Sequence, residues 1–449
     1  MTSKELVLSA LRLKETPRVP WVPYVGVHGG RLLTMTAHEY LSSVQNMVMG
    51  IQKAIDLYRP DGIPVSFDLQ LEAEALGCTL LFADDNPPAV TGHILCGDKK
   101  LEELTIPSKT DARIPLVLEA ARILRKNNPD IALYGLVTGP FTLALHLLGT
   151  EIFTKMYEDP DYVMALMDFC SQVAQSMSDY YIEAGCDVVA LVDPMTSQID
   201  PDSFALFVKE PMTKLFDHLR NKGVLGSFFV CGYAEHNLAL MCQCRPHNIA
   251  VDENIPLSLV RDLALAAGIS FGGNLKLTTT LLLGTPQECA YDALECIDTG
   301  GLRGFVLAPG CDLPMHTPIE NLKAVSDLVH DSYQQDVLRN MPKSVDNIPQ
   351  IDISQRYPAG KAVVDVVTLD SLGCAPCQYM MALVRSVVAA MGNHVECHEH
   401  KIKTIEGLKM MKALQVQHIP TICINGKIEF ISITPSKEEL TEAINKSFP

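Results

Sequence analysis

The chain has 449 residues, more than one ordinary domain requires, so we expect two or three domains. Its formal net charge of -17 argues against nucleic acids and anionic membrane surfaces as partners, because both bind through basic patches. The first residues carry charges within an apolar run and lack a small-residue cleavage site, which is not typical of a signal peptide. The long uncharged stretch 131–150 contains glycines and a proline, which favour a strand, a turn and a helix over a membrane span. Fourteen cysteines in such a chain indicate a reducing cytoplasm, with thiols kept for metal or redox chemistry.

From Leu6 to about Ser332, short β-rich runs alternate with longer amphipathic stretches. This alternation predicts a parallel α/β domain whose size fits a (β/α)8 TIM barrel, with a doubly wound sheet as the alternative. The predicted strands are 62–66, 131–137, 187–191, 224–230, 249–251, 269–272 and 304–307. The predicted helices include 160–184, 203–221, 257–267 and 286–299.

A polar segment with three prolines and no helical period follows, and it predicts a linker over 336–358. The linker separates a barrel domain, 1–335, from a second small α/β domain, 359–449. For the second domain the pattern predicts strands at 362–369 and 394–398, helices from the GCAPC segment to about 391 and over 405–414, a hairpin turning at 425–426, and a last helix from about 435.

Cys374 and Cys377 form a Cys-x-x-Cys motif after the first predicted strand of this domain, where a helix begins. Unsatisfied amides and the helix dipole at that position favour the thiolate of Cys374, which makes it the attacking sulfur. Cys377 would then resolve the mixed disulfide. The alternative is half of a four-cysteine zinc site, but Cys397 and Cys423 are single and far apart, so a redox role is favoured.

This domain resembles the thioredoxin and glutaredoxin superfamily, in a minimal version that starts directly at the strand before the dithiol. The likeness rests on GCAPC after the first strand and on IPT before the hairpin, where Pro420 matches the family's cis-proline beside the dithiol. The resemblance implies thiol–disulfide exchange with Cys374 as the nucleophile.

Two further cysteines, Cys231 and Cys311, each follow a predicted strand of the first domain. Parallel strands of a barrel present the active site at their carboxyl ends, so the two residues are placed as active-site groups would be. The alternative is that both are buried thiols without a role, which is where unpaired cysteine usually lies.

The first domain resembles the uroporphyrinogen decarboxylase superfamily, a (β/α)8 barrel, over nearly all of 1–332. The likeness rests on the segments SFDLQLEAEALGC, TGPFTLALHLLG, DPMTSQIDPDSF, FFVCG, GGNL and APGCDLP. The ending resembles the cobalamin-dependent methyltransferase branch, typified by methylcobamide:coenzyme M methyltransferase. The decarboxylase branch carries an arginine-rich segment near the N-terminus, whereas here only Arg31 is nearby. Decarboxylation of a polyacidic porphyrinogen is therefore disfavoured.

In the methyltransferase branch a His-x-Cys motif and a distant cysteine bind zinc, which activates the acceptor thiol. By this resemblance Cys231 and Cys311 match the two cysteine ligands, but Phe229 replaces the histidine. Glu253 is a candidate for the missing ligand, with Asp252 and His236 as weaker candidates. The alternative is that the chain binds no zinc and that the two cysteines act as a bare thiol pair or have no role.

Three polar residues are candidates for substrate binding: Asp68, Asp193 and Asn274. Asp68 matches the family's substrate-facing aspartate by motif, although it also suits the role of a helix cap. Asp193 follows a predicted strand, where a barrel presents its site, but Asp-Pro also commonly opens a turn. Asn274 lies beside two glycines that allow close approach of the backbone to a ligand, or it is a plain loop residue.

Together these patterns predict an enzyme that moves a methyl group from a corrinoid donor, such as methylcobalamin, to a small thiol acceptor. The corrinoid would be free or carried by a partner protein, and a thiol reductant would serve the dithiol domain, which in turn keeps the barrel cysteines reduced. The alternative is a redox protein whose barrel is a corrinoid-binding or docking module without methyl transfer.

Overall fold

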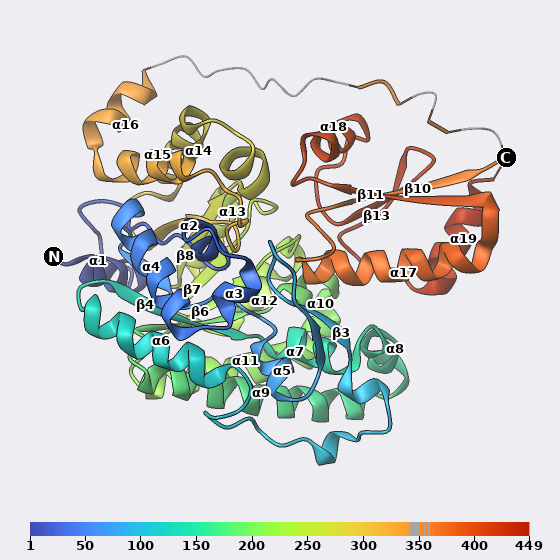
Figure 1. The fold of residues 1–449 in the computed structure, drawn as a ribbon, viewed down its shortest axis with the longest axis horizontal. Helices are drawn as coiled ribbons and strands as arrows, with labels where there is room; N and C mark the ends of the chain where they lie inside the picture. Colours follow the sequence, from blue (N-terminus) through green and yellow to red (C-terminus); the bar gives the residue numbers. More distant parts are fainter. Residues whose placement is uncertain (341–350, 354–355, 358–359, 449) are drawn as a thin grey trace.

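The computed structural model describes residues 1–340, 351–353, 356–357 and 360–448. In Figure 1 they form a large domain, coloured blue through yellow to the light orange of α16, and a small one, coloured orange to red. The centre of the large domain is a curled sheet of parallel strands in the order β1-β4-β5-β6-β7-β8-β9. These strands are β1 (Gly62–Pro64), β4 (Ala132–Thr138), β5 (Val188–Val192), β6 (Leu225–Val230), β7 (Asn248–Val251), β8 (Ser270–Leu275) and β9 (Phe305–Pro309). All seven predicted strands are confirmed, and the barrel-like fold class with them.

The remaining position of the ring is filled by the segment around Trp21. Trp21 forms a parallel bridge with Leu307 on β9, and its carbonyl accepts the N–H of Asp61, just before β1, at 2.8 Å. The segment therefore bonds to both edges of the sheet and closes it. Pro20 and Pro23 have no N–H to donate, so the segment forms only an isolated β-bridge with β9 and not a continuous strand.

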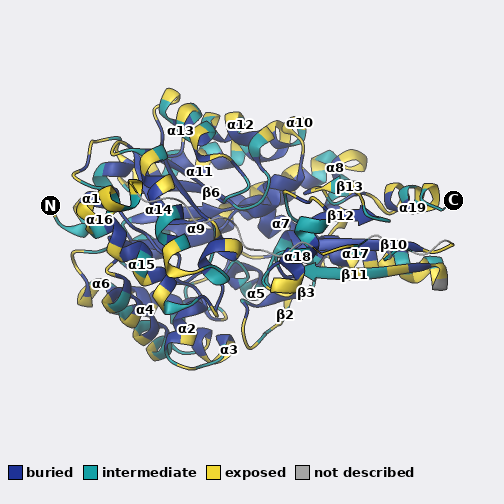
Figure 2. Ribbon diagram, turned by 90° about the horizontal axis from the view of Figure 1, so that it is seen from above, coloured by how far each residue is buried: buried dark blue, intermediate teal, exposed yellow. Residues whose placement is uncertain are grey.

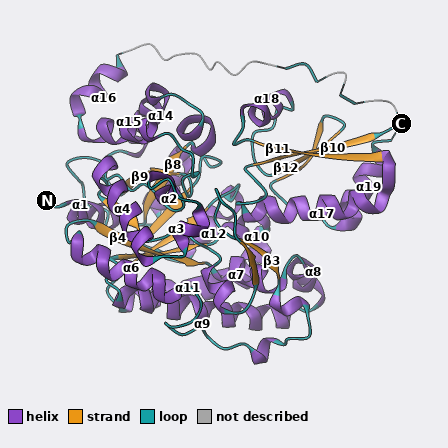
Figure 3. Cartoon of the chain, viewed as in Figure 1, coloured by secondary structure: helices purple, strands orange, loops and turns teal. Residues whose placement is uncertain are grey.

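Helices cover the outside of this sheet, as Figure 3 shows. They are α1 (Ser3–Leu11), α2 (His28–Leu32), α3 (Ala37–Leu41), α4 (Val44–Tyr58), α5 (Leu71–Ala75), α6 (Ile114–Asn127), α7 (Pro140–Leu148), α8 (Glu151–Glu158), α9 (Pro160–Glu183), α10 (Pro201–Ser203), α11 (Lys209–Asn221), α12 (Leu238–Gln243), α13 (Leu257–Ala266), α14 (Pro286–Gly300), α15 (Ile319–His330) and α16 (Ser332–Arg339). The predicted helices are confirmed, except that 203–221 is α10, a π turn over 204–208 and α11. In the described part of the chain no helix is both long enough and apolar enough to cross a membrane.

An antiparallel hairpin, β2 (Thr79–Leu81) and β3 (Ala89–Gly92), projects from the connection between β1 and α6. Its turn reaches the small domain, where the Asn86 side chain accepts a hydrogen bond from Lys403 Nζ at 2.7 Å. The hairpin thus extends the barrel toward the second domain.

Helix α16 occupies the first residues of the predicted linker, because it continues to Arg339. The Asp331 carboxylate accepts the N–H of Tyr333 at 2.9 Å and caps the helix, and Arg339 pairs with Asp298 at 2.6 Å. The expectation of no helix from 336 onward is therefore wrong for its first residues. Residues 341–350, 354–355 and 358–359 lie outside the described residues, so the linker stays a prediction there.

The small domain has a four-stranded sheet in the order β11-β10-β12-β13. Its strands are β10 (Ala362–Thr368), β11 (Val395–Lys401), β12 (Thr421–Ile424) and β13 (Lys427–Ile431), and its helices are α17 (Ala375–Met391), α18 (Ile405–Ala413) and α19 (Lys437–Lys446). The apolar side chains of α17 and α19 pack on one face of the sheet and those of α18 on the other. Asn425 and Gly426 have positive φ angles and form the predicted hairpin turn. In Figure 2, β10 is buried along its length, whereas the edge strands β11 and β13 are more exposed.

The first turns of α17 pack against the barrel. Tyr379 is only 3% exposed and belongs to the main hydrophobic cluster of the barrel, and its hydroxyl lies 3.4 Å from the carbonyl oxygen of Leu145. The neighbouring Gln378 donates to the carbonyl of Val90 at 2.6 Å. The two domains therefore share part of one core.

Replacing Tyr379 by alanine should release the small domain from the barrel. Truncation of a buried aromatic side chain typically costs about 3 kcal/mol or more. We expect a larger radius of gyration in small-angle X-ray scattering with unchanged secondary structure by circular dichroism. Tyr333→Ala is the matched control, because Tyr333 is 75% exposed. An unchanged radius in the Tyr379→Ala variant would show that other contacts hold the domains together.

Candidate active site

A cavity of about 130 Å³ lies between the carboxyl ends of the barrel strands and the small domain. The loops after β1, β5, β6, β7, β8 and β9 contribute to its barrel side, together with the turn of the β2–β3 hairpin. The start of α17, the residue Lys403 and the peptide Ile419–Pro420 contribute to its other side. Active sites of (β/α)8 barrels lie at this face, so the cavity is the candidate site.

Cys231 and Cys311 lie together on the barrel side of the cavity, as their predicted positions at strand ends require. Cys231 follows β6 directly, and Cys311 comes two residues after β9. The two are joined as a disulfide with their Cα atoms 6.2 Å apart. Both residues are half-buried, so their sulfurs are neither sealed in the core nor fully exposed.

Cys374 and Cys377 line the same cavity from the small domain and are also joined as a disulfide, with Cα atoms 5.3 Å apart. Cys374 is the N-cap residue of α17 and is half-buried. Cys377, one turn further, is fully buried. The Ile419–Pro420 peptide bond beside them is cis, as the resemblance to thioredoxins implied for Pro420.

Phe229 occupies the position at which the resemblance implied a zinc-binding histidine. Its ring is fully buried inside the barrel, with its centroid 4.8 Å from that of Tyr24 and 6.0 Å from that of Phe67. A phenyl ring supplies no metal ligand, and the two cysteine sulfurs are bonded to each other. Among the described residues, no group of three or more His, Cys, Asp or Glu side chains is arranged to hold a metal ion. The residues of this disulfide-bonded site therefore do not fit zinc.

Two acidic residues after β7, Asp252 and Glu253, line the cavity. The Asp252 carboxylate accepts the N–H of Gly232, next to Cys231, at 2.5 Å. Burial raises the pKa of Asp252 to about 6. Glu253 accepts the N–H of Leu277 at 2.9 Å through Oε1, whereas its buried Oε2 has no hydrogen-bond partner among the described residues. Burial and the neighbouring Asp252 raise the pKa of Glu253 to about 8.

His236, the weaker ligand candidate, does not line this cavity. It is exposed, and its Nε2 lies 2.9 Å from the carbonyl oxygen of Ile199.

Asp312 and Lys403 line the cavity although the sequence patterns did not single them out. Asp312 follows Cys311, and its buried Oδ1 has no partner in the described part of the structure; burial raises its pKa well above the usual range. Lys403 pairs with Asp370 at 3.8 Å, and burial lowers its pKa. The adjacency of Asp312 to a candidate cysteine was a usable signal. Nothing local connects Lys403 with the barrel, whose last helix ends at Arg339.

Asp68 does not line the cavity and instead anchors the loop after β1. Its carboxylate pairs with Arg113 at 2.6 Å and accepts the N–H of Gln70 at 3.0 Å. Asp68 therefore fixes the loop that brings Gln70 to the cavity wall.

Asp193 and Asn274 likewise hold loops and lie outside the cavity lining. The buried Asp193 carboxylate accepts the N–H groups of Phe141 at 3.0 Å and Thr142 at 2.8 Å, at the start of α7. Asn274 donates to the carbonyls of Asp252 at 3.2 Å and Ile255 at 2.8 Å. Asn274 thus positions the loop that carries Asp252 and Glu253.

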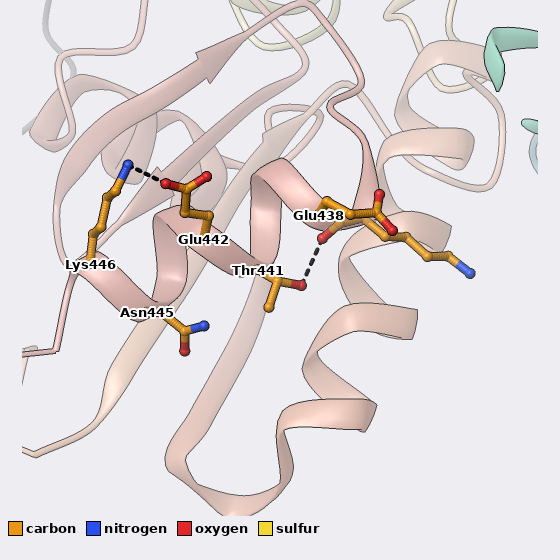
Figure 4. A pocket seen from close by; sticks show the side chains of 6 residues that line it. Glu438, Thr441, Glu442, Asn445 and Lys446 are labelled. Atoms are coloured by element: carbon orange, nitrogen blue, oxygen red, sulfur yellow. Dashed lines mark hydrogen bonds and ion pairs between the residues drawn. The ribbon is translucent and has the colours of Figure 1, made fainter.

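Figure 4 shows a second hollow, on the outer face of α19. It is lined by residues of this one helix, and two of its charged groups pair with each other, with Lys446 Nζ 2.7 Å from Glu442 Oε1. It brings together no groups from separate elements, so we assign it no function.

The uroporphyrinogen decarboxylase family model matches residues 2–332. The chain belongs to this family. A thioredoxin-domain model matches residues 363–445. The two matches correspond to the barrel and to the small domain, so the chain is a family member with a thioredoxin domain at its carboxyl end.

Relatives within the family include methyltransferases and decarboxylases. The methylcobamide:CoM methyltransferase MtbA of Methanosarcina acetivorans is 28% identical over 330 residues, which is 72% of this chain and 96% of that protein. A uroporphyrinogen decarboxylase of Thermus thermophilus is 25% identical over 342 residues, 73% of this chain and 98% of that protein. The solved structure of a methyltransferase from Methanosarcina mazei superposes with a TM-score of 0.68 and 26% identity, covering 74% of this chain and 98% of that one. In all three comparisons the matched length corresponds to that of the barrel.

The geometry predicts that the protein carries well under one zinc ion per chain when it is purified without chelator. The measurement is metal content by plasma mass spectrometry, on the reduced wild type and on Cys311→Ser. Zinc near one per chain in the wild type and lost in the variant would contradict this expectation, and it would show that reduction rearranges Cys231, Cys311 and Glu253 into a metal site.

Glu253→Gln should change how thermal stability depends on pH. The pKa of Glu253 is raised from its ordinary 4.5 to about 8, so between these values the folded chain holds a proton that the unfolded chain has lost. The wild type therefore loses stability as pH rises through this window, and the variant lacks this loss. We expect the Tm difference, variant minus wild type, to rise by about 2 °C from pH 5 to pH 8. Glu406→Gln, at an exposed position, is the control; a flat difference for Glu253→Gln would mean that Glu253 is ionised when folded.

Proposed function

We propose that this protein is a methyltransferase that moves a methyl group from a corrinoid donor to a thiol acceptor at the barrel cavity, with its thioredoxin domain acting on thiols and disulfides. The observation that carries the proposal is the relation to methylcobamide:CoM methyltransferases, which extends over 72% of this chain and 96% of MtbA. The donor is a free or protein-bound corrinoid, and the acceptor is a small thiol.

The acceptor thiol would lose its proton to a group of this chain as its sulfur takes the methyl group. A carbon–sulfur bond forms while the carbon–cobalt bond breaks, and the electron pair of the broken bond stays on the corrinoid. Asp252 suits the role of proton acceptor, because it lines the cavity and its carboxylate bonds to the backbone next to Cys231. Burial and the neighbouring Asp252 raise the pKa of Glu253, which favours its protonated form.

Methyl transfer requires the thioredoxin domain to move away from the barrel. The cavity beneath it measures about 130 Å³, whereas pockets for small organic ligands usually measure roughly 300–1,000 Å³. A corrinoid is larger than most such ligands, so it cannot enter while α17 is docked. The described arrangement is therefore the closed state of the proposed enzyme, with the donor site covered.

A redox protein without methyl transfer is the second candidate. Two observations favour it: Phe229 removes a ligand that the methyltransferase branch uses to activate thiols, and all four cysteines of the two disulfides line one cavity. Decarboxylation of a porphyrinogen is less favoured. The cavity lining contains the acidic residues Asp85, Asp252, Glu253 and Asp312 and one cation, Lys403, whereas a polyacidic substrate needs several cations.

The test is a methyl-transfer assay with methylcobalamin and small thiols such as 2-mercaptoethanesulfonate or homocysteine. Protein is reduced with a phosphine and desalted first, so that the added thiol is the only acceptor in solution. We expect thiol-dependent loss of methylcobalamin with formation of the thioether, followed by absorbance and mass spectrometry.

The variants separate the two candidates. Asp252→Asn should lower the rate by about tenfold, whereas Cys374→Ser should leave the rate of the pre-reduced protein unchanged. Cys242→Ser is the control, because this half-buried cysteine lies outside the cavity lining. No thioether from any thiol, in protein that still exchanges disulfides, would favour the redox protein.

A further inference from the structure

The arrangement of the four cysteines around one cavity has a chemical consequence of its own. Cys231 and Cys311 line it from the barrel, and Cys374 and Cys377 line it from the thioredoxin domain. The chain contains ten other cysteines, which are free, and none of them lines this cavity. Among the described residues, the two disulfides therefore line the same cavity from opposite sides.

The two sulfurs of the thioredoxin domain differ in access to the cavity. Cys374 is half-buried at the N-cap of a 17-residue helix, and Cys377 is fully buried behind it. Free amides at a helix start stabilise a thiolate, which makes Cys374 the better nucleophile of the pair. Exchange with a second disulfide requires an attacking sulfur that this disulfide can reach and a resolving sulfur that acts afterwards. The more accessible Cys374 and the buried Cys377 meet these two requirements.

The contacts between the domains hold Cys374 and Cys377 at the barrel. On one side Tyr379 is buried in the barrel core and Gln378 bonds to Val90. On the other side Lys403 bonds to Asn86 of the hairpin, and the ring centroid of His418 lies 4.4 Å from that of Tyr233. A tether combined with such docking raises the effective concentration of one cysteine pair at the other.

We infer that the thioredoxin domain directly reduces the Cys231–Cys311 disulfide of its own chain across this cavity. Cys374 thiolate bonds to one sulfur of the barrel pair, the Cys231–Cys311 bond breaks, and the other barrel sulfur leaves with the electron pair and takes up a proton from water. Cys377 then loses its proton and attacks Cys374, which forms the Cys374–Cys377 disulfide and releases the second barrel thiol. Two electrons and two protons pass from the dithiol to the barrel, and an external dithiol reductant restores Cys374 and Cys377.

This activity is a second one, which does not depend on methyl transfer, and its test needs no methyl donor. Fully oxidised wild type, Cys374→Ser and Cys242→Ser are exposed to limiting dithiothreitol under native conditions, quenched with acid and alkylated. Mass spectrometry of the peptides then follows the reduction of Cys231 and Cys311. We expect Cys374→Ser to slow this reduction by about tenfold or more and Cys242→Ser to leave it unchanged. Equal rates in wild type and Cys374→Ser would overturn the inference.

A trapping experiment keeps the inference testable if a serine variant folds poorly. In Cys311→Ser/Cys377→Ser and in Cys231→Ser/Cys377→Ser, one barrel cysteine and Cys374 remain. Mild oxidation should join them in at least one of the two proteins, as an intrachain disulfide identified by mass spectrometry. The control Cys231→Ser/Cys311→Ser/Cys377→Ser keeps Cys374 without a partner in the cavity and should form no such link. The absence of the link from both double variants would also overturn the inference, whatever the outcome of the methyl-transfer assay.

Discussion

The burial of Tyr379 in the barrel core is the contact on which the arrangement of the site depends. Tyr379 lies two residues after Cys377, on the same first turns of α17. Because a helix is rigid over such a distance, fixing its phenol ring also fixes the cysteine pair at the helix start. This helix, Lys403 and the Ile419–Pro420 peptide together cover the cavity at the carboxyl ends of the strands. The packing of this one aromatic side chain therefore helps to hold both disulfides at one cavity.

The barrel side of the cavity is built on anchored loops. Asp68, Asp193 and Asn274 bond to backbone groups or to a buried arginine within or between loops. These bonds satisfy polar groups that burial would otherwise leave unpaired, and they hold the loops in one conformation. The barrel side is therefore preorganised, while the other side comes from a domain that docks as a unit. Motion is expected between the domains rather than within the barrel loops.

Much of the fold was predictable because buried parallel strands are continuous apolar runs, and these marked all seven strands of the large sheet. The closing segment around Trp21 was missed because two prolines interrupt its pattern. The extension of α16 was missed because it depends on an aspartate cap and on an ion pair between Arg339 and Asp298, which no local period reveals.

The site was predictable in part. The cysteines were found from their places at strand ends and at a helix start. Lys403 was not found, because its contact with Asn86 joins residues 317 positions apart. Motif matching also selected Asp68, Asp193 and Asn274, which shape the site without lining it. A residue that matches a family motif can hold a loop in place or contact a substrate. Only the three-dimensional structure distinguishes these two roles.

The covalent fusion of the two domains also fixes the ratio of dithiol domains to barrel domains at one to one. Every barrel is made with one dithiol domain, whatever the level of expression. For the proposed reduction of the barrel disulfide, a separately encoded dithiol protein would have to be produced in proportion to the barrel protein. It would also have to reach that protein by diffusion among other oxidised proteins. Here neither gene dosage nor competition from other clients can leave a barrel without its own dithiol.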